Sequence, residues 1–155
     1  MSLTHLDELI KKGIESGAEI TVFAPASSEK ILAAESMLKI VFPSSYKNFL
    51  MKYGAIEIGT CPFSGLVSDD VGNNGDVVSF TKYARENYGL PTRYIAINFE
   101  DEDAFLCIDT EQKNIEDESP IVLVKPTNGK QIGGVVASTL PDYLVEYLTG
   151  YLSDD

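Results

Sequence analysis

Residues 35–54 read ESMLKIVFPSSYKNFLMKYG and predict two helices joined by a tight corner. The second helix is expected to begin at Pro43-Ser44, because proline fixes φ and serine offers an oxygen to a first turn. It is expected to end at Gly54, since glycine most easily adopts the left-handed cap. Between these signals, apolar residues recur at i, i+3, i+4 and i+7 and share one face, which predicts that the face is buried. These four residues are Tyr46, Phe49, Leu50 and Tyr53.

Outside this corner, the hydrophobic spacing predicts helices first, then strands, then a last helix. Helical spacing occurs at 4–17, 27–38, 76–88 and 139–152, and strand-like runs occur at 20–23, 56–58, 63–66, 94–99, 104–109, 121–124 and 132–137. Pro62 is expected to separate two of these short runs. The order favours an α+β fold, with N- and C-terminal helices packed against a largely antiparallel twisted sheet, over alternating βαβ units. With 155 residues and no internal repeat, we expect one domain over 1–155 with its core at about 4–152.

The corner also carries a resemblance to a known family. A glutamate near the end of one helix, a short link and then Phe-Pro-x-x-Tyr-Lys-x-Phe-Leu-x-x-Tyr-Gly is similar to the signature of the SUKH superfamily. That superfamily includes yeast cell-wall-synthesis regulators and many small bacterial immunity proteins. The matching positions, which we interpret as the structural motif, are Glu35, Phe42, Pro43, Tyr46, Lys47, Phe49, Leu50, Tyr53 and Gly54.

The resemblance extends over residues 27–152, because the later strands and the last helix follow the family's order. The sequence departs from the family at Leu140, where an aromatic residue is usual, and at 100–103, where the family has a glycine-containing turn. The resemblance implies the family's α+β fold and a role in binding another protein.

The composition is that of an ordinary soluble globular protein, with 44% hydrophobic and 23% charged residues. No apolar run is long enough to span a membrane and no charged-then-apolar leader precedes the first helix, so we expect a cytoplasmic protein that does not bind membranes. Cys61 and Cys107 are the two cysteines, and we expect buried reduced thiols here in preference to a disulfide or a metal site.

The net charge of -12 is unevenly distributed along the chain. Residues 98–118 contain nine acidic residues and one lysine, and therefore hold eight of the twelve excess negative charges. A surface of this sign repels nucleic-acid phosphates and anionic lipid, and it attracts basic proteins. We therefore expect no nucleic-acid binding and favour a basic protein partner.

The residue types needed for catalysis or cofactor binding do not occur at the required spacing. His5 is the single histidine and lies near the N-terminus, which disfavours Ser-His-Asp and Cys-His catalysis. The glycines at 129–134 lack the pattern of a phosphate-binding or dinucleotide-binding loop, and no residues have zinc-ligand spacing. We expect no catalytic residue, no cofactor and no metal.

Three features keep alternative interpretations open. The acidic run 100–103 is either a solvated hairpin turn, which we favour, or a calcium site. Glu35 either accepts hydrogen bonds from Ser44 and Ser45, which we favour, or serves as a carboxylate in catalysis such as glycoside hydrolysis. Phe63 precedes an acidic loop and could belong to a partner-facing rim.

The resulting hypothesis is a non-enzymatic immunity protein that neutralises a toxin by occlusion. In the systems of the family that it resembles, the toxin is often a nuclease, so a basic toxin domain is the expected partner. The alternative is a regulatory scaffold that binds a cellular enzyme, as the cell-wall regulators suggest. The candidate partner-binding residues are Glu100, Asp101, Glu102, Asp103, Glu116, Asp117 and Glu118, with Asp69 and Asp70 as a second group.

Overall fold

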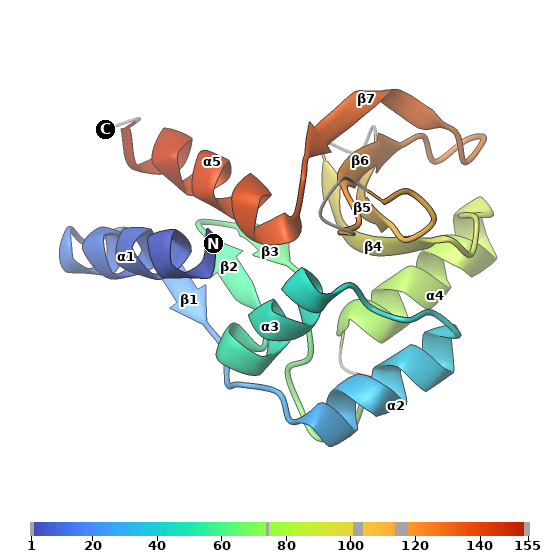
Figure 1. Cartoon of the computed structure of the whole chain (residues 1–155), viewed down its shortest axis with the longest axis horizontal. Coiled ribbons are helices and arrows are strands. Elements are labelled where there is room, and N and C mark those ends of the chain that lie inside the picture. Colours follow the sequence, from blue (N-terminus) through green and yellow to red (C-terminus); the bar gives the residue numbers. More distant parts are fainter. Residues whose placement is uncertain (1, 74, 101–103, 114–117, 154–155) are drawn as a thin grey trace.

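The computed structural model describes residues 2–73, 75–100, 104–113 and 118–153 (Figure 1). The helices are α1 (Ser2–Glu15), α2 (Ser28–Leu38), α3 (Ser44–Tyr53), α4 (Val77–Tyr88) and α5 (Leu140–Ser153). The strands are β1 (Ile20–Val22), β2 (Ile56–Ile58), β3 (Cys61–Phe63), β4 (Tyr94–Glu100), β5 (Ala104–Asp109), β6 (Ile121–Val124) and β7 (Gln131–Ala137). The predicted α+β fold is confirmed.

The strands form two antiparallel sheets within the described residues, where the sequence predicts a single sheet. The small sheet has the order β1-β2-β3 and the large sheet the order β4-β5-β6-β7. Helices α1 and α5 run side by side next to the small sheet, and α4 packs on β4 of the large one (Figure 1). The two sheets meet where β3 lies next to β4.

Pro62 lies inside β3 and does not separate two strands as predicted. It pairs with Glu57 of β2, so the third strand covers 61–63 and not 63–66. A proline lacks a backbone donor, but β3 is the last strand of its sheet, where that donor is not needed.

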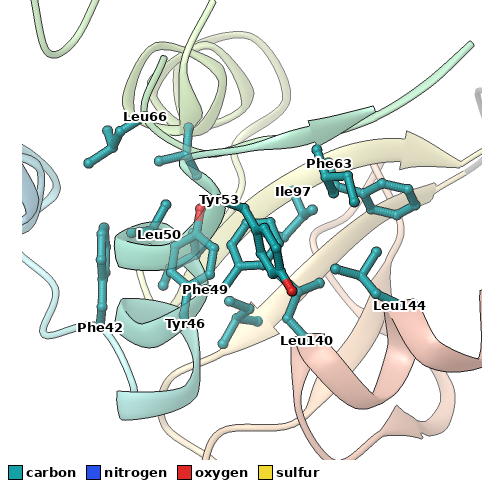
Figure 2. Close-up of a cluster of buried hydrophobic side chains, with 14 of the residues drawn as sticks. Phe42, Tyr46, Phe49, Leu50, Tyr53, Phe63, Leu66, Ile97, Leu140 and Leu144 are labelled. Carbon is teal, nitrogen blue, oxygen red and sulfur yellow. The ribbon is translucent and has the colours of Figure 1, made fainter. Parts of the chain in front are cut away.

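The buried face of α3 forms the centre of the main core (Figure 2). Tyr46, Phe49 and Leu50 are fully buried and Tyr53 is 3% exposed, which confirms the predicted face. Each such side chain contributes roughly 1.5–3 kcal/mol by leaving water. The Tyr46 hydroxyl donates to the carbonyl oxygen of Ser64 at 2.8 Å, so even the polar end of this buried ring has a partner.

Gly54 ends α3 as predicted, but its φ of 73° and ψ of -63° are not those of the expected left-handed cap. A Cβ at this position would lie 2.1 Å from the carbonyl oxygen of Ala24 and 3.0 Å from that of Leu66. The helix end therefore needs glycine for two reasons, its backbone conformation and the close approach of two other chain segments.

Among the described residues, three helices begin with a side-chain cap. The side chains of Ser27, Asp76 and Thr139 accept hydrogen bonds from backbone N–H groups in the first turns of α2, α4 and α5. These bonds satisfy donors that have no partner within the helix. Helix α1 begins at Ser2, two residues before the predicted Thr4.

Phe63 does not face a partner, and that interpretation is wrong. It is 1% exposed, and its ring packs against Tyr143 and Tyr147 of α5 at centroid distances of 6.2 and 5.2 Å. Strand β3 turns this side chain inward because successive residues of a strand point to opposite faces.

The two cysteines differ in burial. Both are free thiols, but Cys107 is fully buried in β5 whereas Cys61 in β3 is partly exposed. The two cysteines are not joined by a disulfide, and the predicted burial holds for Cys107 alone.

Candidate functional site

Four of the nine acidic candidates lie within the part of the chain that the structure describes. Asp69 and Asp70 lie in the loop between β3 and α4, Glu100 ends β4, and Glu118 precedes β6. The other five lie outside the described residues; they are Asp101, Glu102, Asp103, Glu116 and Asp117.

Asp69 and Asp70 are exposed to solvent. Asp69 has a side chain that is 98% exposed and forms an ion pair of 2.9 Å with Lys30 of α2. The hydrogen bond and positive charge of Lys30 lower the pKa of Asp69 from its ordinary value. The carboxylate of Asp70 accepts a hydrogen bond of 3.0 Å from Asn73. Because both carboxylates are exposed, they are accessible to a partner, and surface pairs of this kind contribute little to stability.

Glu118 has a structural contact at the corner. Its Oε1 accepts hydrogen bonds from the Ser45 hydroxyl at 2.8 Å and from the Ser45 backbone N–H at 3.4 Å. Pro43 precedes α3 and provides no side-chain cap, so Glu118 supplies the acceptor from 73 positions away. A carboxylate there also interacts favourably with the positive end of the helix dipole.

Glu35 stabilises the corner, but through different partners from those predicted. Its Oε2 accepts a hydrogen bond of 2.7 Å from the backbone N–H of Phe42 and lies 3.6 Å from Nζ of Lys47. The chain turns back toward Glu35 because Lys39, with a left-handed φ of 58°, caps α2. The Ser45 donors are bound by Glu118 instead.

No group of three or more His, Cys, Asp and Glu side chains among the described residues could hold a metal ion. The acidic run that raised the calcium alternative lies at Glu100 and in the undescribed residues 101–103. His5 is exposed on α1.

One candidate binding feature is a cleft that the sequence did not predict. It encloses about 640 Å³ between α4, β3 and β4, and its surface is mostly apolar. We call it the aromatic cleft, and its walls include Pro62, Ser64, Phe80, Tyr83, Asn98 and Phe99. Clefts of this size and character are typical binding sites.

Aromatic rings from α4 and the large sheet form one wall of the aromatic cleft. Phe80 of α4 contacts Phe99 of β4 at 6.4 Å between centroids, and Phe99 stacks on Phe105 at 4.2 Å. Tyr83, one turn further along α4, is 47% exposed. Exposed aromatic residues next to a cleft are characteristic of the centres of protein interfaces.

The floor of the aromatic cleft joins the two sheets. A bulge interrupts the pairing of β4 with β5 between Ala96 and Asn98. Asn98 donates through Nδ2 to the carbonyl oxygen of Pro62 at 3.0 Å, and the Ser64 N–H donates to the carbonyl oxygen of Ile97 at 3.2 Å. These bonds hold β3 against β4 and fix the side chain of Asn98 in the cleft floor.

Sequence reasoning missed Tyr83 and Phe99 as binding candidates. A signal was available on α4, where Phe80 and Tyr83 are spaced i, i+3 beside a separate set of buried residues. That set comprises Val77, Val78, Thr81 and Ala84. Because α4 has aromatic residues beside its buried stripe, it has more apolar surface than the core of this chain covers, which indicates a binding surface.

Comparisons with known proteins agree with the fold. The SUKH_5 family model, described as SMI1-KNR4 cell-wall, matches residues 6–149. A crystal structure of a protein from Pseudomonas syringae pv. tomato has a TM-score of 0.64 to this chain and 14% sequence identity, and the match covers 88% of this chain and 93% of that one. The family match supports a protein-interaction module. Among the described residues, no helix has the length and apolar character needed to cross a membrane.

Proposed function

This chain belongs to the SUKH family described as SMI1-KNR4 cell-wall, and from that premise we propose that it is an immunity protein that neutralises a toxin domain by occlusion, without catalysis. The supporting observation is the charge. The chain carries a net charge of -12, and eight of the excess negative charges fall within residues 98–118. Such a charge complements a basic cleft, for example that of a nuclease, and accelerates association.

The acidic residues that we assign to this interface are Glu100, Asp101, Glu102, Asp103, Glu116, Asp117 and Glu118, with Asp69 and Asp70. Asp69 and Asp70 are exposed and available. Glu118 contributes charge near the same segment while it caps α3. Because the steering is electrostatic, it depends on the number of charges and on salt more than on any single contact.

The experiment uses a toxin domain, which this proposal expects to be encoded next to this chain in its genome. Co-expression of the chain should rescue growth, and purified chain should bind the toxin domain with an association rate that falls steeply as salt rises. Charge reversal at 100–103 should slow association and flatten its salt dependence. Growth arrest despite co-expression, with no binding, would contradict the proposal.

The second candidate is a regulatory scaffold that binds a cellular enzyme. The observation that favours it is the family's own description as cell-wall. The genomic neighbourhood discriminates the two functions: an adjacent toxin gene supports immunity, whereas a chain encoded among cell-wall enzymes and without a toxin supports the scaffold.

A further inference from the structure

Asn98, which lines the aromatic cleft, carries a buried polar atom without a partner among the described residues. Asn98 is 5% exposed, and within the described residues its Oδ1 has no hydrogen-bond partner, although its Nδ2 donates to Pro62. Exchanging the amide oxygen and nitrogen would place two acceptors against each other, so the assignment follows from the contact with Pro62. A buried acceptor without a donor costs free energy, and such exceptions in a structure need an explanation.

The surroundings of Asn98 specify what could supply the missing donor. The walls present the rings of Phe80, Tyr83 and Phe99, and the six named wall residues include no charged side chain. Rings prefer to stack on rings or to meet them edge to face. The matching group is an aromatic ring that carries an N–H, which among the amino acids is best represented by tryptophan.

The chain segments around the aromatic cleft indicate the charge of the occupant. Gly75 lines the cleft and ends the loop that carries Asp69 and Asp70. On the other side, Phe99 lines the cleft and is followed directly by Glu100. Two lining residues of the cleft are thus continuous in sequence with acidic segments of a strongly acidic chain, which favours lysine and arginine in the occupant.

We propose that the aromatic cleft is the anchor pocket of this chain's protein interface and receives a tryptophan from a basic segment of the partner, whose indole N–H donates to Oδ1 of Asn98. The inference rests on the proposed protein-binding function. It divides the interface into two parts: the acidic residues attract the partner, and the cleft holds it. This division follows the general pattern in which charge sets association rates and buried aromatic anchors set dissociation rates.

A donor can reach Oδ1 of Asn98 only if the cleft wall changes. Oδ1 is shielded from solvent in the free chain, whereas Tyr83 is half exposed and lies in the wall. The proposed contact therefore requires a change of side-chain rotamer at the wall that opens a path to Oδ1, and such changes are common when interfaces form.

The first test uses indole and benzofuran as probes of the free chain. The two molecules have nearly the same shape, but benzofuran has an oxygen in place of the N–H. Titration followed by amide chemical shifts should place both at Ser64, Tyr83 and Phe99, with indole binding about fivefold tighter because it alone donates a hydrogen bond. Equal affinities, or shifts away from the cleft, would overturn the proposal.

A variant with a matched control localises the probe. Tyr83→Ser should weaken indole binding, whereas Leu32→Ser on α2, where the native side chain is 64% exposed, should not. An effect of equal size in both variants would show nonspecific binding and overturn the proposal. The comparison of two probes on the unchanged chain avoids Asn98 variants, which would also lose the bond to Pro62.

The second test uses the toxin domain and separates the two proposals. Tyr83→Ser should raise the dissociation rate of the complex at least tenfold while leaving the association rate and its salt dependence nearly unchanged. If the toxin domain binds both proteins equally, the cleft assignment is wrong and the immunity function stands. If the unchanged chain does not bind the toxin domain, both the immunity function and the assignment of the cleft to that interface are wrong.

Discussion

Arg93 binds the fully buried carboxylate of Asp109 through two parallel hydrogen bonds, of 2.8 Å from Nε and 2.9 Å from a terminal nitrogen. The arginine precedes β4 and the aspartate ends β5, so the pair connects the ends of two neighbouring strands. The hydrogen bonding to Asp109 and the negative charge of Asp109 raise the pKa of Arg93. Arg93 therefore stays charged throughout the ordinary pH range.

Arg93→Met should destabilise the chain by about 3 kcal/mol. The substitution leaves the buried carboxylate of Asp109 without its main partner. The expected loss of stability is at the low end for buried pairs because the Arg93 side chain is 34% exposed. Urea unfolding measures the change. Arg93→Lys should lose less stability, since lysine keeps the positive charge; it should still lose some, because lysine cannot form the two parallel hydrogen bonds. Lys82→Met, at an exposed position of α4, serves as the control. Equal stability of the Arg93→Met and Lys82→Met variants would contradict this prediction.

Glu118→Ala should lower stability by about 1 kcal/mol, the typical value of a helix cap. The expected reason is the loss of the acceptor for Ser45 at the start of α3. Ser45→Ala should cost a similar amount, and the double variant should cost less than the sum, because both single changes remove the same hydrogen bond. Thermal unfolding of the three variants provides the measurement, and strict additivity would show that the two residues do not act together.

The corner could be predicted from the sequence because its signals are local. Proline, the i, i+3, i+4 spacing and the terminal glycine lie within residues 43–54 and act through the backbone of the same helix. The contacts around the corner could not be predicted, because Ser45 finds its acceptor at Glu118, 73 positions later. No local pattern specifies such a pair.

The candidate site shows the same limit. Strand β3 has three residues, too few for an alternation that would show which face Phe63 takes. The aromatic cleft also depends on the bulge that separates Ala96 from Asn98, and β4 shows no glycine or proline that would mark it. The burial of Phe63 and the exposure of Tyr83 therefore could not be predicted without knowing how the two sheets are arranged.

Gly54→Ala should destabilise the chain by more than about 3 kcal/mol. The added Cβ would lie 2.1 Å from a backbone oxygen that cannot move without shifting the segment before α2. Gly89→Ala is the control for a positive φ, because Gly89 also ends a helix, with a φ of 66°, but has open space around its Cα; its ψ of 30° differs from the -63° of Gly54. That control should cost about 1–2 kcal/mol from backbone strain alone. Equal losses in the two variants, measured by urea unfolding, would exclude the proposed clash.

Iodoacetamide should label one of the two cysteines in the folded chain. Burial, with a smaller effect of the charge of Asp109, raises the pKa of Cys107 well above its ordinary value, and its side chain is fully buried in β5. Alkylation requires an exposed thiolate, so Cys107 should react only when the large sheet opens. Cys61, partly exposed in β3, should react without global unfolding.

Mass spectrometry of peptides from briefly labelled protein distinguishes the two sites, and labelling in denaturant gives the reference in which both react. Arg93→Met should increase labelling of Cys107 more than that of Cys61, since the loss of the contact with Asp109 raises the population of the open sheet. If Cys107 reacts as fast as Cys61 in the native chain, the sheet opens without global unfolding, and the pair of Arg93 and Asp109 does not hold it closed.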